Sequence, residues 1–237
     1  MHTTAITGTA TQPFMGAALG DGAKVSGFAA AAPNGIETGA LGLAGSRVRF
    51  ERDAEIYAEG DDAACFYEVV SGVVRTSKLL ADGRRQIGAF LLPGDIFGFE
   101  AGAEHRFAAE AVTDCTVMVH RRRGVEALAA RDAGLAQRLF AHTVRNLERT
   151  QEHMLLLGRK NAAEKVAAFL LDMAERAPAG DGVDLPMTRY DIADYLGLTI
   201  ETVSRTLSQL ERQSAISLPS TRHIVLKNRA ALRRLNA

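Results

Sequence analysis

Short hydrophobic runs separated by glycine turns fill the chain from Arg47 to about Arg123. Runs of this length and composition, bounded by glycine turns, are typical of β-strands. The runs that we expect to form strands cover residues 48–50, 54–57, 65–70, 72–80, 86–92, 95–97, 105–107, 110–112 and 116–120. Asp82-Gly83, between two of them, is a hairpin-turn signature. Many short strands with this punctuation predict a closed or double-sheet β domain.

The hydrophobic period becomes helical from about Asp132 to Leu157. One heptad-like seam is predicted on this helix, formed by Phe140, Val144, Leu147, Gln151 and Met154. The seam could pack against the chain's own β domain or against a second copy of the chain. We favour the second copy, and so a homodimer, because a long helix that joins two domains has an exposed seam to bury.

Residues 184–212 show the pattern of helix, tight turn and helix. Thr188 can cap the first helix, with Asp191 three residues later as its capping-box partner. Gly197 interrupts the pattern where a turn is needed, and Thr199 can cap the second helix. The order of signals predicts a helix-turn-helix unit. Upstream, residues 161–164 are typical of a capping box that opens another helix.

The second helix of this unit has two distinct faces. At 100° per residue, Val203, Leu207 and Leu210 form an apolar side that can pack on the first helix. The opposite side carries polar groups that can read base edges, an arginine for guanine and a carboxylate for cytosine. These residues are Glu201, Ser204, Arg205 and Ser208, with Ile200 beside them. The alternative is an ordinary solvated face, on which Glu201 only complements the helix dipole.

Two short strands around a Pro-Ser turn are expected within residues 215–227, as in the wing of a winged helix, whereas residues 177–183 are expected to form a loop. Side chains next to the predicted reading helix and the wing are candidates for contact with DNA phosphates, which position a protein without reading sequence. They are Thr188, Arg189, Thr199, Arg222 and His223.

Charge supports a localised contact with a polyanion. The net charge is zero over 237 residues, but seven Arg and Lys stand against two acids from Leu198 onward. A basic end on a neutral protein is typical of nucleic-acid binding by one domain. The two cysteines, Cys65 and Cys115, indicate a reducing compartment and a cytoplasmic protein. No apolar run reaches the length that spans a membrane, so no membrane partner is expected.

These patterns together predict an α+β protein with four parts. Residues 1–46 are rich in Ala, Gly and Thr, show no signal-peptide pattern, and are expected to be flexible or loosely attached. Residues 47–125 form the closed or double-sheet β domain. Residues 126–158 form the dimerisation helix, and residues 159–237 form a winged helix-turn-helix DNA-binding domain.

This order of parts resembles the CRP/FNR family of bacterial transcription regulators. The resemblance implies that the β domain of residues 47–125 is a β-roll, a jelly roll like a cyclic-nucleotide-binding domain. The most specific matches are residues 90–98 (FLLPGDIFG), 155–164 (LLLGRKNAAE) and 191–205 (DIADYLGLTIETVSR). Glu-x-x-Ser-Arg is the reading set of the FNR branch, and it corresponds here to Glu201, Ser204 and Arg205. Within that branch, the chain is similar to FixK-type regulators of microoxic respiration, denitrification and nitrogen fixation.

The resemblance implies a regulator, mainly an activator, that binds double-stranded DNA as a dimer at a site close to TTGA, six bases, then TCAA. Arg205 is then assigned to the guanine and Glu201 to its cytosine, with Ser204 and Ile200 meeting neighbouring thymines. A family contact with RNA polymerase lies on a β-roll hairpin turn. Here that turn holds Asp82, Gly83, Arg84 and Arg85, and a plain solvated turn is the alternative.

No effector site is predicted. Residues 1–64 contain no cysteine, so the iron–sulfur cluster of FNR lacks its N-terminal ligands. Phe99 stands where cyclic-AMP-binding relatives have a glutamate, and Arg106 is followed by Phe107 instead of a hydroxyl residue. His105 is expected in a surface loop and not as a haem ligand. We therefore expect no cofactor, no metal and no ligand requirement, as the resemblance to FixK-type members implies. The alternative is a regulator gated by an unidentified small molecule in the β-roll.

Neither cysteine is predicted to be a sensor, because Cys115 is expected in a buried strand and acidic neighbours would raise the pKa of Cys65. An enzyme is the competing class of protein. The sequence has no nucleophile elbow, phosphate-binding glycine loop or metalloprotease motif, and Gly39–Gly45 lack the preceding strand of a nucleotide fingerprint. We therefore expect no enzymatic activity.

Overall fold

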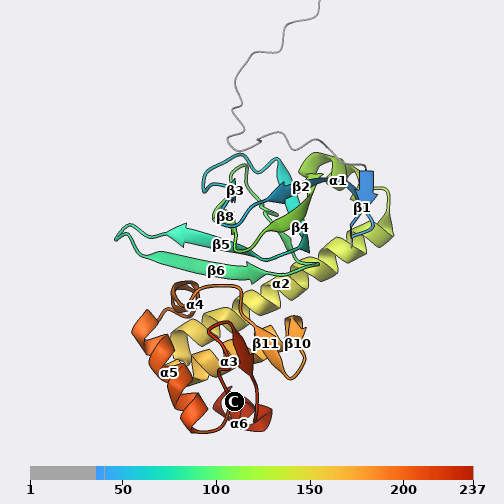
Figure 1. Ribbon diagram of the computed structural model, residues 1–237. Helices are drawn as coiled ribbons and strands as arrows, with labels where there is room; N and C mark the ends of the chain where they lie inside the picture. Colours follow the sequence, from blue (N-terminus) through green and yellow to red (C-terminus); the bar gives the residue numbers. More distant parts are fainter. Residues whose placement is uncertain (1–35, 40, 237) are drawn as a thin grey trace, which may run out of the picture.

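The computed structural model describes residues 36–39 and 41–236, and its N-terminal unit consists of two facing sheets (Figure 1). One sheet has the order β1 (Ile36–Thr38), β2 (Ala44–Phe50), β9 (Cys115–Arg121), β4 (Cys65–Ser71) and β7 (Ile96–Phe97). The other has the order β3 (Glu55–Tyr57), β8 (Ala108–Ala111), β5 (Val74–Leu79) and β6 (Arg85–Leu91). All pairings within the two sheets are antiparallel. The double-sheet β domain predicted from the short runs and their glycine turns is confirmed.

The interior of this β-roll is filled by side chains from both sheets. Val69 and Val117 of one sheet pack against Val74 and Ala111 of the other, and Tyr57 lies in the same cluster. The expected strand at 105–107 is absent: residue 104 makes only an isolated bridge to Asp62. The runs around Asp82-Gly83 do form a hairpin, with Gly83 at a positive φ of 83° that favours glycine.

A second hydrophobic cluster lies on the outer side of the first sheet. It shows that the β-roll begins before residue 47, where the sequence predicted its start. Leu41 and Leu43 are buried there with Phe66, Val125 and Leu135. Because β1 and these leucines precede residue 47 and β2 begins at Ala44, the expectation of a loosely attached segment is wrong for residues 36–39 and 41–46. The rest of that prediction, on residues 1–35 and 40, lies outside the described residues.

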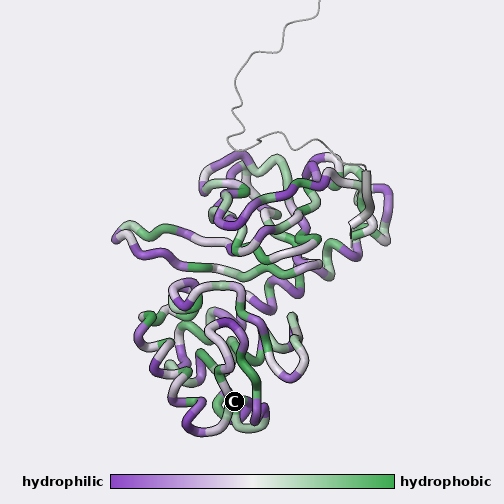
Figure 2. The backbone as a smooth tube through the Cα atoms, in the orientation of Figure 1, coloured by the Kyte–Doolittle hydropathy of each residue, from purple (hydrophilic) through white to green (hydrophobic). Residues whose placement is uncertain are grey.

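Two helices replace the single helix predicted over residues 126–158. α1 (Arg122–Ala129) packs after β9, and α2 (Ala133–Arg159) begins after Asp132, whose side chain accepts a hydrogen bond from the Leu135 amide. At 1.5 Å per residue, the 27 residues of α2 span about 40 Å. The helix runs from the β-roll to the C-terminal unit (Figure 1). Hydrophobic and hydrophilic positions alternate along it (Figure 2).

The C-terminal unit is a helical domain with a small sheet. It contains α3 (Ala162–Arg176), β10 (Pro178–Ala179), β11 (Gly182–Asp184), α4 (Arg189–Leu196), α5 (Ile200–Arg212), β12 (His223–Val225) and α6 (Arg229–Asn236). The predicted capping box at the start of α3 is present, formed by Asn161 and Glu164. Phe169, Leu196 and Val203 belong to one core that joins α3, α4 and α5.

The predicted wing is only partly correct. β12 forms, but its first expected partner contributes one isolated bridge, from Ser217 to Val225. The main partner is β11, which pairs with β12 at Val183 and Ile224. Residues 177–183, expected as a loop, contain the β10–β11 hairpin. Among the described residues, no helix is both long enough and apolar enough to cross a membrane.

Candidate nucleic-acid interface

The helix-turn-helix unit is built by the local signals that the sequence contains. The Thr188 hydroxyl accepts from the Asp191 amide at 3.1 Å, and the Asp191 carboxylate accepts from the Thr188 amide at 3.0 Å, which confirms the capping box. Gly197 ends α4 in the left-handed region, with φ 60° and ψ 44°. Thr199 then caps α5 by accepting from the Thr202 amide at 3.2 Å. Both ends of the turn are therefore defined by residues within or next to the two helices.

The two faces predicted for α5 are both present. Val203, Leu207 and Leu210 are buried, as is Thr206, which the sequence pattern did not single out. The opposite face is exposed to solvent and consists of Glu201, Ser204, Arg205 and Ser208, while Ile200 beside it is half-buried. Within residues 36–39 and 41–236, neither Glu201 nor Arg205 is recorded in an ion pair. The face thus offers hydrogen-bonding groups that the fold itself does not use.

Candidates for phosphate contact gather where the start of α4 meets β12. Arg189 donates to the Thr221 carbonyl at 3.2 Å, and the Leu185 amide donates to the Arg222 carbonyl at 2.8 Å. His223 Nδ1 lies 2.7 Å from Asp184 Oδ1, across the β11–β12 pair. Burial lowers the pKa of Arg189. Thr199 lies apart from this group, at the start of α5.

One exposed residue of this region was missed. Tyr190, at the second position of α4, is 65% exposed. The polar pattern singles out Thr188 and Arg189 but gives no reason to separate Tyr190 from the core. The only available signal was its position in the first turn of a capped helix, where backbone amides point towards a ligand.

The predicted seam of α2 lies on the surface of the single chain. Phe140, Leu147 and Met154 are 70%, 55% and 63% exposed, and Val144 and Gln151 are also exposed. Leu155, which the heptad pattern did not include, is exposed as well. A row of large apolar side chains along one helix is unusual on a monomer surface. The row has the spacing of a coiled-coil seam.

The β5–β6 turn divides the residues predicted to meet RNA polymerase. Asp82, Gly83 and Arg84 form the exposed tip, where Arg84 Nε donates to Asp82 Oδ2 at 2.7 Å. Hydrogen bonds from the Arg84 backbone and side chain lower the pKa of Asp82. Arg85 differs from the prediction, because its guanidinium bonds Asp191 and Asp194 of α4 instead of lying at the exposed tip. Paired acidic groups on α4 outcompete solvent for this side chain, so Arg85 is not part of a docking tip.

In the β-roll, the position of His105 differs from the surface loop that the sequence predicted. His105 is not a surface residue: it is 2% exposed, and its ring stacks on Tyr57 with 3.7 Å between centroids. Burial lowers the pKa of His105 because removal from water disfavours the charged imidazolium. Cys115 is buried, as predicted, and burial raises its pKa to about 11. Burial likewise raises the pKa of the half-buried Cys65 thiol, so neither thiol is activated.

No group of three or more His, Cys, Asp or Glu in the described part of the chain could hold a metal ion. The exposed polar face of α5, flanked by α4 and β12, is therefore the strongest candidate for a functional surface. A capped helix with Glu, Ser and Arg on its open side has the groups that contact base edges in a major groove.

Comparisons with known proteins agree with this geometry. Residues 47–132 match the family profile described as a cyclic nucleotide-binding domain, and residues 164–235 match the Crp-like helix-turn-helix domain. Nitrogen fixation regulation protein FixK of Azorhizobium caulinodans is 52% identical over 198 residues, which cover 81% of this chain and 80% of that protein. FixK of Rhizobium meliloti is 44% identical over 212 residues, covering 87% and 97%.

A solved structure shows the same fold. FixK2 from Bradyrhizobium japonicum superposes with a TM-score of 0.79 at 50% identity, and the match covers 82% of this chain and 98% of that one. The relatives are transcription regulators with a DNA-binding domain and are not enzymes. The identities, the two matched domains and the fold lead to one conclusion: the chain belongs to the CRP/FNR family of transcription regulators, as a FixK-type member.

Proposed function

We propose that this regulator binds, as a homodimer and without an effector, to a palindrome close to TTGA-N6-TCAA, and that it activates genes of microoxic respiration, denitrification or nitrogen fixation. The observation that carries the proposal is the open face of α5, where Glu201, Ser204 and Arg205 stand exposed on a helix capped at Thr199. The gene classes follow from the likeness to FixK proteins.

The chemistry of base reading follows from the side chains. Arg205 has a planar fork of donors that matches the two acceptors of guanine in the major groove. Glu201 stands one turn earlier, about 6 Å along the axis, and accepts from the amine of the paired cytosine. Ser204 and Ile200 meet neighbouring thymines through hydroxyl and methyl contacts. Thr188, Arg189, Thr199, Arg222 and His223 contact phosphates and fix the register.

The dimer supplies the spacing. Two chains pair along the α2 seam of Phe140, Val144, Leu147, Gln151 and Met154. Exposure of these residues in the single chain supports the pairing, because burial of large apolar side chains is the main favourable contribution to association. A two-fold axis along this seam places the two reading helices about 34 Å apart, one turn of DNA.

Independence from an effector is supported by the filled β-roll. Tyr57, Tyr67 and Phe97 stack on one another with centroids 5.2–6.1 Å apart, and His105 covers Tyr57. These rings occupy the region between the sheets where a small molecule would need space. A cleft of about 490 Å³ does exist, but it lies outside the roll, between β6, α2 and α3. Phe99 also offers no carboxylate to a ribose.

Contact with RNA polymerase is assigned to the hairpin tip of Asp82, Gly83 and Arg84. Arg84 is 78% exposed, and Leu79 next to the tip is 67% exposed. A charged side chain beside an exposed leucine is the composition of a small protein-docking surface, with an apolar anchor and a polar rim.

Selection of binding sites from random DNA tests the proposal. The purified protein is used with no added nucleotide and no added metal. We expect enrichment of TTGA and TCAA half-sites separated by six bases. Enrichment only after a small molecule is added would instead support a ligand-gated regulator, and enrichment of no sequence would contradict base reading by α5.

A further inference from the structure

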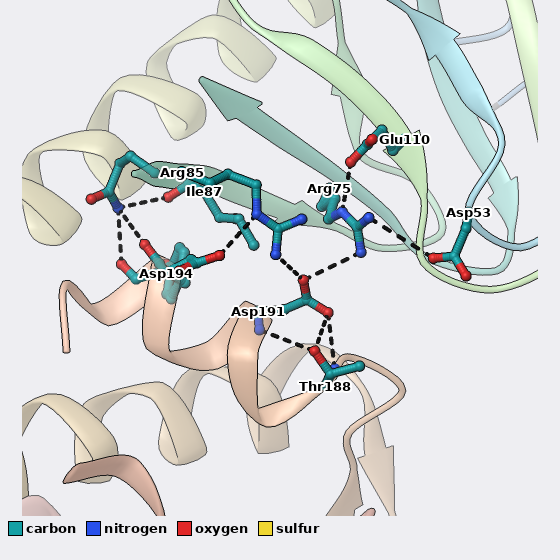
Figure 3. Close-up of polar contacts among 10 residues, drawn as sticks. Asp53, Arg75, Arg85, Ile87, Glu110, Thr188, Asp191 and Asp194 are labelled. Atoms are coloured by element: carbon teal, nitrogen blue, oxygen red, sulfur yellow. Dashed lines mark hydrogen bonds and ion pairs between the residues drawn. The ribbon is translucent and has the colours of Figure 1, made fainter. Parts of the chain in front are cut away.

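Helix α4 is held from the side by the β-roll. Arg85 at the start of β6 donates from Nε to Asp194 at 2.8 Å and from a terminal nitrogen to Asp191 at 2.6 Å. Asp191 and Asp194 are three residues apart, so both face the same side of α4. Figure 3 shows the two carboxylates pointing from α4 towards the strands. One guanidinium thus bonds two positions along a helix in another domain.

A second arginine reinforces the contact at Asp191. Arg75 of β5 donates to Asp191 Oδ1 at 3.3 Å, and its own position is fixed by Glu110 at 2.8 Å (Figure 3). Both Arg75 and Asp191 are largely shielded from water, with 11% and 3% of their side chains exposed. Burial opposes ionisation of Asp191, but the bonds from Thr188 and the two guanidinium groups outweigh it and lower the pKa of this carboxyl. Ion pairs in such surroundings are little screened by salt.

The far end of α4 also depends on the strands. A helix leaves its last carbonyls without partners inside the helix. The Gln86 amide donates to the Asp194 carbonyl at 2.8 Å and to the Tyr195 carbonyl at 3.3 Å. Lys165 of α3 donates to the Leu196 carbonyl at 3.0 Å. An eight-residue helix is not stable alone, so these partners help to form α4 as well as place it.

From these contacts we infer that Arg75, Arg85 and Gln86 are positioning residues for DNA binding. They set the direction of the reading helix α5 relative to the dimer helix α2. The inference rests on the proposed function. α4 and α5 share one core, in which Ile192 and Leu196 lie with Val203, so α5 moves with α4. The β-roll is attached to α2, which carries the two-fold axis. The ion pairs between the β-roll and α4 therefore connect the two-fold axis to the reading helix through side-chain contacts, in addition to the covalent connection through α3.

The covalent route alone leaves this direction loosely defined. α2 ends at Arg159, and the extended backbone of the following Lys160, with φ −91° and ψ 144°, separates it from α3. Other contacts cross the same boundary: Arg176 of α3 donates to the Phe90 carbonyl at 2.8 Å, and His153 stacks on Tyr195. Within residues 36–39 and 41–236, only the contacts of Arg75, Arg85 and Gln86 reach α4 through directional bonds from the strands, and directional bonds fix angle as well as distance.

The spacer between half-sites measures this direction. Adding or removing one base pair rotates a half-site by about 35° around the DNA axis. A dimer with fixed reading helices discriminates against that change, whereas loosened helices follow it. The test measures dissociation constants of full-length protein, at one salt concentration, for palindromes with spacers of five, six and seven base pairs.

The variants are Arg85→Gln, Asp194→Asn and the double variant, with Arg84→Gln as the matched control. Arg84 is the neighbouring residue and loses the same charge, but it bonds Asp82 within the hairpin turn. We expect Arg85→Gln to reduce the preference for the six-base spacer by about tenfold. The double variant should lose no more than Arg85→Gln alone, because both remove one interaction. Arg84→Gln should retain the parent's preference.

Several results separate the possible failures. If Arg85→Gln remains a folded dimer and keeps the parent's spacer preference, the inference is overturned. If Arg85→Gln does not fold, the spacer preference of Asp194→Asn decides instead, because this variant leaves the cap at Asp191 intact. A folded Asp194→Asn dimer with the parent's preference then overturns the inference. A change in thermal midpoint with an unchanged spacer preference would show a stabilising role only, which also overturns it. If the parent itself prefers no palindrome, the proposed function fails first.

Discussion

The imidazole ring of His153 on α2 lies nearly parallel to the phenol ring of Tyr195 on α4, with 4.1 Å between centroids and 19° between planes. Both ring nitrogens of His153 are buried and have no hydrogen-bond partner among the described residues. Burial, helped by the charge of Lys165, lowers the pKa of His153 to about 4. A neutral histidine is therefore part of the contact between the dimer helix and the DNA-binding domain.

This contact predicts loss of stability in mild acid. Between pH 6.5 and about 4, the unfolded chain binds a proton at His153 that the folded chain does not, so stability is complete above pH 6.5 and falls as pH decreases. His153→Phe keeps an aromatic ring and removes the proton site. We expect it to reduce the loss of unfolding free energy between pH 7 and pH 5 by about 1 kcal/mol, after allowing for partial exposure.

Denaturant unfolding at the two pH values measures this difference. The pKa of His105 and of His142 is also lowered by burial, so part of the acid sensitivity should persist in the variant. An acid loss in His153→Phe as large as in the parent would show that the His153 ring takes up its proton without opening the fold.

Leu147→Glu should separate the dimer. The substitution puts a charge in the middle of the α2 seam, where it would be buried against the partner helix at a cost of several kcal/mol. Light scattering should show monomers at micromolar concentration, with much weaker binding to the palindrome. Asn146→Glu adds the same charge one residue away, off the seam, and should remain a dimer. A dimer of unchanged mass for Leu147→Glu would mean that the seam faces something else.

DNA binding should need neither a cyclic nucleotide nor iron. Phe99 provides no ribose acceptor, the stacked rings of Tyr57 and Tyr67 fill the roll, and residues 1–64 contain no cysteine. Affinity for the palindrome should change by less than about threefold when cyclic AMP is added. A larger gain, or an iron–sulfur absorption band in protein purified without oxygen, would contradict this expectation.

The hairpin tip should affect transcription without affecting DNA binding. Arg84→Ala removes the exposed guanidinium at the tip, so transcription from a target promoter in vitro should fall while the dissociation constant for DNA stays the same. Arg85→Ala should instead change DNA binding, because Arg85 bonds α4. Unchanged transcription with Arg84→Ala would leave the tip as a solvated turn.

The sequence predicted local features better than contacts between domains. The caps at Thr188, Thr199 and Asn161 and the turn at Gly197 depend on residues within four positions of one another, so their signals are readable in the chain. The bond from Arg85 to Asp194 joins residues 109 positions apart, and no periodicity reports it. From the sequence alone, a charged residue next to a hairpin tip is therefore expected to face solvent, because the chain does not reveal which domain lies beside it.

Two other errors have the same origin. His105 follows a polar loop and has the pattern of a surface residue, but Tyr57, from a distant strand, covers its ring. Residues 177–183 lack strand periodicity, and they become extended because β12, about 40 residues later, supplies hydrogen-bond partners. On α5, by contrast, helical geometry alone separated the exposed polar face from the buried face, because all the residues involved belong to one element.

Base reading by Arg205 is the central claim, and one measurement tests it most directly. Dissociation constants of the parent and of Arg205→Ala are compared for the TTGA-N6-TCAA palindrome and for sites with the guanine replaced. Arg212→Ala, which removes the same charge near the end of α5, is the control and should weaken all sites alike. Loss of Arg205 should cost about 1–3 kcal/mol per half-site on the palindrome and remove the preference for guanine. If Arg205→Ala still prefers guanine as strongly as the parent does, Arg205 does not read that base, and the orientation assigned to α5 in the groove is wrong.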